Sequence, residues 1–79
     1  MKKALKITND TYLNMQSIIM YHFEIDRVIL RTPLDSESNG ILIAAEKRMF
    51  DSGYTKEFVV SIEEVKRIQR EICKYMGIE

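Results

Sequence analysis

The short stretch HFEID holds the residues best suited to metal chemistry in this chain. On a strand, His22, Glu24 and Asp26 project to one side, because successive side chains alternate between the two faces. One imidazole and two carboxylates are donors that suit a divalent cation. A closed site needs a further protein ligand, and the sequence marks none. The favoured interpretation is therefore a solvated strand edge, and neither a metal nor another cofactor is predicted.

A second candidate chemistry is nucleophilic catalysis by Cys73, the single cysteine, with His22, the single histidine, as its base. The pair would have to meet in the fold beside a group that binds an oxyanion. The sequence contains no glycine-rich phosphate loop and no cysteine pair for zinc. Free cysteines are commonly buried, and we expect Cys73 to pack behind the end of a helix. The sequence therefore predicts no catalytic residue and a protein that is not an enzyme.

Basic residues near the C-terminus form a candidate nucleic-acid-binding site. They share one predicted helix and could contact phosphates together with the N-terminal lysines: Lys66, Arg67, Arg70 and Lys74. Glu63 and Glu64 precede them, where carboxylates would repel a phosphate. The spacings Glu63–Arg67 and Arg67–Glu71 also predict ion pairs on the helix surface. An exposed, charge-paired helix is therefore the favoured interpretation, and nucleic-acid binding is the alternative.

Amphipathic side chains in the first half of the chain predict contact with another protein. Tyrosine suits interfaces, because it joins an apolar body to a polar tip. Methionine is expected mainly to fill the core, and an adaptable binding face is its less favoured interpretation. The predicted surface joins the broad apolar face of a first helix to the acidic loop after Pro33: Tyr12, Leu13, Met20, Tyr21, Asp35 and Glu37. Apolar anchors would supply affinity and rim charges specificity. A second copy of the chain could cover the same face, so a homodimer is a further prediction.

The elements that hold these residues begin with a short strand over 2–8, where lysine alternates with apolar residues. The triplet TND that follows consists of good helix N-caps, and apolar residues then recur at helical spacing. This pattern predicts a helix over 10–22. The stretch DRVILRTP next predicts a strand that Pro33 ends.

The clearest helix signal spans residues 61–77. Ser61 and Glu64 have the spacing of a capping box, and Gly77 suits a left-handed C-terminal cap with Ile78 folding back onto Cys73. One apolar stripe runs along the helix: Val65, Ile68, Ile72 and Tyr75 or Met76. The stretch EFVV at 57–60 leads into the cap and predicts a strand.

Residues 38–51 decide the fold class, because they fit two structures. The stretch AAEKRM favours a helix, which would give βαβαβα with a small parallel sheet. The run ILI directly after SNG instead favours a strand that pairs with DRVILRT. Basic residues in the first two predicted strands suit an antiparallel sheet with one solvated face. The predicted fold is therefore α+β, in the order β-α-β-β-β-α, an antiparallel meander with two helices on one face. The parallel arrangement is the alternative.

Length and composition set outer bounds on function. The 79 residues predict a single domain, 1–79, and 46% hydrophobic with 30% charged residues is ordinary for a globular protein. A formal net charge of zero argues against a general polyanion binder, although the middle third is acidic and both ends are mildly basic. The apolar runs are too short to span a membrane, and one cysteine agrees with a reducing compartment, so we expect a cytoplasmic protein.

These observations predict a small non-enzymatic regulator or inhibitor that occludes a surface of a partner protein. Its size suggests that a phage or mobile element encodes it. Another protein is the favoured partner, nucleic acid is less favoured, and no membrane partner is predicted. The motifs identify no family.

Overall fold

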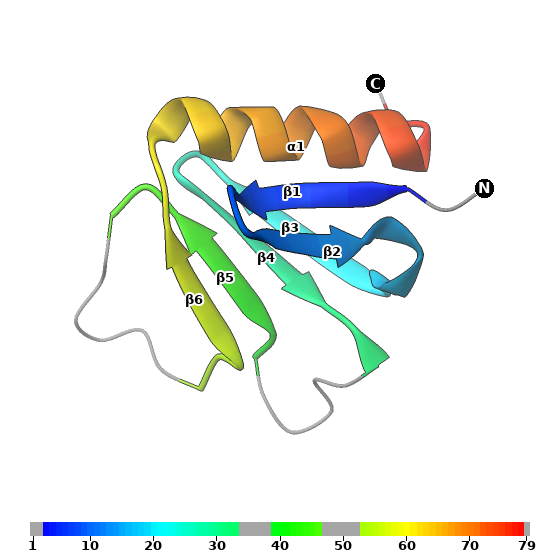
Figure 1. Ribbon diagram of the computed structural model, residues 1–79, viewed down its shortest axis with the longest axis horizontal. Helices are drawn as coiled ribbons and strands as arrows, with labels where there is room; N and C mark the ends of the chain where they lie inside the picture. The colour runs from blue at the N-terminus through cyan, green and yellow to red at the C-terminus, as the bar shows by residue number, and fades with distance from the viewer. Residues whose placement is uncertain (1–2, 34–38, 47–52, 79) are drawn as a thin grey trace.

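The computed structural model describes residues 3–33, 39–46 and 53–78 of the chain. They fold as an α+β arrangement in which a two-stranded hairpin, a four-stranded sheet and a C-terminal helix follow one another (Figure 1). The elements are β1 (Ala4–Thr8), β2 (Thr11–Asn14), the 3-10 turn η1 (Met15–Ser17), β3 (Met20–Glu24), β4 (Arg27–Arg31), β5 (Ile41–Ala44), β6 (Lys56–Val59) and α1 (Ile62–Met76). The class α+β and the strand predicted over 2–8 are confirmed.

The helix predicted over 10–22 is wrong, because this stretch forms β2, η1 and the first part of β3. The TND triplet makes a turn instead of a helix cap: the Asp10 carboxylate accepts hydrogen bonds from the hydroxyls of Thr8 at 2.8 Å and Thr11 at 3.2 Å. This turn directs β2 back along β1. The β-branched and aromatic residues that follow then find strand partners, and this pairing outweighs their helical spacing. The described part of the chain therefore has one α-helix where two were predicted.

The four-stranded sheet has the order β3-β4-β5-β6. Its first three strands are antiparallel, which confirms the predicted pairing of DRVILRT with the ILI strand. The strand predicted over 57–60 is confirmed as β6, but the meander is wrong in its last step. Strand β6 runs parallel to β5, and a parallel pair needs a crossover connection instead of a tight hairpin. The remaining part of the ambiguous segment, 47–52, lies outside the described residues.

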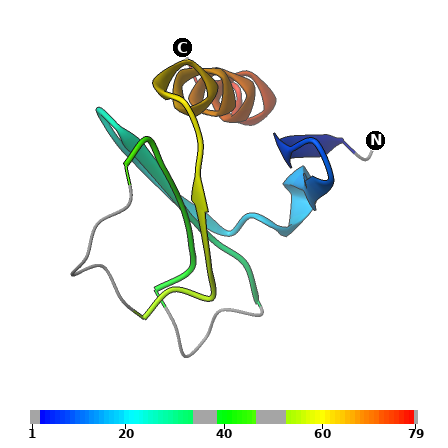
Figure 2. The same cartoon turned by 60° about the vertical axis from the view of Figure 1, so that its left-hand side comes forward.

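The core lies where the helix, the sheet and the hairpin meet. Figure 2 looks nearly along α1, with the four-stranded sheet below it on one side and the hairpin on the other. The predicted helical stripe is confirmed: Val65, Ile68 and Ile72 are all fully buried. Fully or nearly fully buried side chains from the sheet and the hairpin region meet this stripe: Leu5, Ile7, Met15, Ile18, Val28, Leu30 and Ile43.

Both predicted caps of the helix are confirmed. The Ser61 hydroxyl accepts a hydrogen bond from the backbone N–H of Glu64 at 3.2 Å. Gly77 adopts the left-handed conformation with φ 77°, and the backbone N–H of Ile78 donates to the carbonyl of Cys73 at 2.8 Å. Local residue chemistry therefore sets the length of α1.

Two glycines with positive φ provide a matched test of how closely the backbone at Gly40 approaches β4. Gly40 has φ 103°, and a Cβ added there would lie 2.3 Å from the carbonyl oxygen of Leu30. Gly77 has φ 77°, but nothing lies within 4 Å of its added Cβ. We expect Gly77→Ala to lower the free energy of unfolding by about 1–2 kcal/mol, the ordinary cost of a left-handed alanine. Gly40→Ala should lower it by clearly more, as measured by urea denaturation. Equal losses would contradict the close approach of Gly40 to β4.

Candidate functional site

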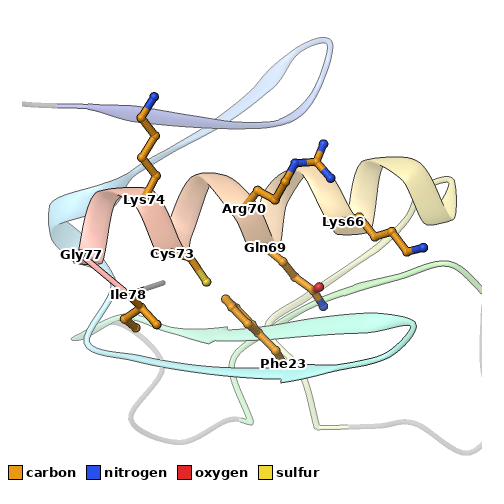
Figure 3. Close-up of a pocket in the computed structure, with 8 residues that line it drawn as sticks. All are labelled: Phe23, Lys66, Gln69, Arg70, Cys73, Lys74, Gly77 and Ile78. Carbon is orange, nitrogen blue, oxygen red and sulfur yellow. The ribbon is translucent and has the colours of Figure 1, made fainter.

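An open groove lies between the C-terminal helix and strand β3 (Figure 3). Its volume is about 620 Å³. Its lining comes from β3, α1 and the residues after the helix: Phe23, Lys66, Gln69, Arg70, Cys73, Lys74, Gly77 and Ile78. The half-buried Phe23 rises from β3 toward Cys73, and Ile78 lies beside them. The α1–β3 groove therefore has an apolar floor.

Three cations line this groove along the helix. Lys66, Arg70 and Lys74 are exposed and recur every four residues, so they form a row along α1 with steps of about 6 Å that turns gradually around the helix. Figure 3 shows the side chains of Arg70 and Lys74 directed away from Phe23. None of the three forms an ion pair or a side-chain hydrogen bond with another residue in the described ranges. The groove is therefore an apolar hollow with a positive rim that pairs with no acidic residue in the part of the chain that the structure describes.

Gln69 ties the helix to the sheet at one end of the groove. Its side-chain Nε2 donates to the backbone carbonyl of Glu24 at 2.8 Å and to that of Arg27 at 3.1 Å. These two residues flank the β3–β4 turn. The contact therefore sets the separation of α1 and β3 where the turn begins.

Arg67 is turned away from this groove and holds the helix against β1. Its guanidinium donates to Glu64 Oε2 at 2.7 Å, to the carbonyl of Lys6 at 2.8 Å, and to the Glu71 carboxylate. The hydrogen bond from Arg67 lowers the pKa of Glu64. The hydrogen bond to Glu64 raises the pKa of Arg67 further. The predicted Arg67–Glu71 pair is confirmed, whereas Glu64 takes the place predicted for Glu63.

Three of the four basic residues of the predicted nucleic-acid-binding site line this groove, and their role in binding stays a prediction. Lys66, Arg70 and Lys74 come together at the α1–β3 groove, and Arg67 does not. Phe23, Gln69 and Ile78 were not predicted to belong to a site. Their role depends on how the sheet packs under the helix, and no local pattern marks it.

The candidate metal ligands do not converge. His22 Nε2 and Glu24 Oε2 lie 3.6 Å apart on exposed side chains, in agreement with their predicted common face. Asp26 belongs to the turn, where its Oδ1 lies 3.5 Å from Arg27 Nε. Within residues 3–33, 39–46 and 53–78, no three His, Cys, Asp or Glu side chains are placed to hold one ion.

The candidate catalytic pair is separated by the sheet. His22 alternates along β3 with Phe23, whose ring packs on the core side and lines the α1–β3 groove. Cys73 lies in that groove, half-buried, so the thiol and the imidazole are on opposite faces. Cys73 is close to the helix cap as expected, but it is only partly covered.

The residues predicted to bind a protein do not share one face. Tyr12 and Met20 are 61% and 57% exposed, whereas Leu13 and Tyr21 are partly buried against the core. Tyr12 and Leu13 are neighbours on β2, and Met20 and Tyr21 are neighbours on β3. Neighbours on a strand point in opposite directions. The helix that would have aligned them does not form. Asp35 and Glu37 lie outside the described residues.

No protein-family model, curated protein or solved structure matches this chain. No helix among the described residues is both long and apolar enough to cross a membrane.

The Arg67–Glu64 contact predicts a pH dependence of stability. The pKa of Glu64 is lower in the folded chain than its ordinary value of 4.5, so its contribution is present above that pH. The contribution is lost as the pH falls through the lowered pKa. We expect the melting temperature of wild type to fall more steeply below about pH 4.5 than that of Glu64→Gln. Glu63→Gln is the matched control from the same helical turn and should follow wild type. Parallel curves for wild type and Glu64→Gln would contradict the assignment.

Proposed function

We propose that this protein is a small non-enzymatic binding module that holds a partner protein in the α1–β3 groove. The supporting observation is the combination of an apolar floor with three rim cations that pair with no described acid. Protein interfaces have the same anatomy, with an apolar centre and a polar or charged rim. A hollow of about 620 Å³ also falls within the usual size of binding pockets.

Binding is favoured over catalysis by the separation of the reactive side chains. His22 and Cys73 lie on opposite faces of the sheet, and the described acids form no cluster in the groove. The groove would cover the surface of the partner that it binds, so other molecules could no longer reach that surface. The mechanism is therefore steric occlusion. The role as regulator or inhibitor, the origin in a phage or mobile element and the cytoplasmic location stay predictions from the sequence.

Nucleic-acid binding is the second candidate, and the even spacing of the cations favours it. Lys66, Arg70 and Lys74 form a row that a phosphate backbone could follow. The apolar floor beneath them has no use in a contact made to phosphates alone. Affinity that falls steeply with salt would distinguish this candidate.

A charge-reversal experiment tests the proposed function. The tagged protein is incubated with host lysate, with and without nuclease, and bound proteins are identified by mass spectrometry. The groove variant carries Lys66→Glu, Arg70→Glu and Lys74→Glu. The matched control carries the same charge change on exposed lysines outside the groove: Lys3→Glu, Lys6→Glu and Lys56→Glu.

We expect wild type and the control variant to retain one stoichiometric protein after nuclease, and the groove variant to lose it by about tenfold or more. Such a loss corresponds to about 1.4 kcal/mol of binding free energy, within the range of a few charged contacts. Equal loss in both variants would show that net charge matters and the groove does not. Recovery that disappears with nuclease would replace the proposal with nucleic-acid binding.

A further inference from the structure

Strand β3 is at the edge of the four-stranded sheet. No strand pairs with its outer side in the described part of the chain. Glu24 and Arg27 face each other across a two-residue turn, which makes them the hydrogen-bonded pair that closes the hairpin. Because backbone groups alternate along a strand, the N–H and C=O groups of Phe23 and Tyr21 are directed outward. This edge can therefore accept another strand.

Phe23 connects this open edge to the groove. Its backbone belongs to the edge strand, and its half-buried ring lies in the groove below α1 (Figure 3). A strand placed beside β3 would have one row of side chains on the same side as Phe23, next to the helix. Its other row would lie beside His22 and Met20, which is 57% exposed. The two rows of an added strand therefore meet two different environments.

The rim cations match the repeat of such a strand. Side chains on one face of a strand recur about every 6.6 Å, which is two residues. Residues four apart on a helix recur about every 6 Å. A carboxylate at every second position of an added strand could therefore meet Lys66, Arg70 and Lys74 in turn, once the long, exposed side chains of Arg70 and Lys74 turn toward the groove. The methylene groups of glutamate would rest on Phe23 and Ile78, while apolar residues of the other row would lie against Met20.

We infer that the occupant of the α1–β3 groove is an extended segment of another protein in which acidic and apolar residues alternate, and that it pairs with the backbone of β3. The inference rests on the proposed function and adds the chemistry and conformation of the bound segment. A second copy of β3 fits less well, because its sequence MYHFE carries one acidic residue, Glu24, and a histidine. Backbone pairing supplies affinity, and the charges select the segment.

Backbone methylation of a defined probe tests the strand pairing. The probe is a fluorescent peptide of alternating valine and glutamate, and its binding is followed by fluorescence anisotropy. Two further peptides carry N-methyl groups on all valines or on all glutamates. These peptides have the same side chains and charge, but in each the methyl groups block a different edge of the strand. We expect one of them to bind about as well as the unmethylated probe and the other to bind at least about tenfold more weakly.

Exchange of the charges provides a second readout and a check of folding. The variant with Lys66→Glu, Arg70→Glu and Lys74→Glu should lose the glutamate probe and gain binding of the matching valine–lysine peptide. The variant with Lys3→Glu, Lys6→Glu and Lys56→Glu should still bind the glutamate probe. Gained binding of the lysine peptide would show that the groove variant is folded.

Several outcomes would overturn the inference. Equal affinity of the two methylated peptides would show that the segment does not pair with β3. Lack of binding by the unmethylated probe would reject an alternating acidic segment. Tighter binding of single-stranded oligothymidine would identify nucleic acid as the occupant. A dimer formed by the protein alone in sedimentation equilibrium, and lost in the groove variant, would identify a second copy as the occupant. In the first two cases, a lysate partner that the groove variant still loses would leave the proposed function standing.

Discussion

The burial of one helical stripe is the constraint on which the rest of this structure depends. Val65, Ile68 and Ile72 are fully buried, and removing each such side chain from water contributes roughly 1.5–3 kcal/mol. The β1–β2 hairpin and the four-stranded sheet share no strand, so they are two separate sheets that α1 joins. The helix contacts β1 on one side and β4 and β5 on the other. This bridging position exposes the opposite side of α1 and leaves the groove beside β3.

Polar contacts then fix the rotation of the helix and divide its charged residues into two groups. Arg67 is committed to Glu64, Glu71 and the backbone of Lys6, and therefore acts as a structural link to β1. Gln69 makes the corresponding link to the β3–β4 turn. Lys66, Arg70 and Lys74 take part in neither link, and they line the α1–β3 groove. The same helix thus carries both charges that hold the fold together and charges that stay exposed along the groove.

Local signals were reliable where the residues carry their own constraint. Ser61 and Gly77 mark the two ends of α1 as predicted. A hydroxyl at the N-cap and a residue tolerant of positive φ at the C-cap satisfy the helix ends without contacts from other parts of the chain. The stretch after Asp10 was misassigned because its apolar residues recur at helical spacing, although they form strands and a 3-10 turn. Its strand partners lie elsewhere in the chain, so only pairing resolves the choice. The parallel direction of β6 was missed for the same reason, since direction depends on the path of the connection.

The sequence by itself determined the extent and buried stripe of the C-terminal helix and the row of Lys66, Arg70 and Lys74, because each follows from residue type and spacing within one element. The tertiary structure alone decided that Arg67 leaves this row and that Phe23 lines the α1–β3 groove from a distant strand. It also decided that His22 and Cys73 stay apart. The physical reason is that a site between two elements depends on their relative packing, and packing is set by contacts between residues far apart in the chain.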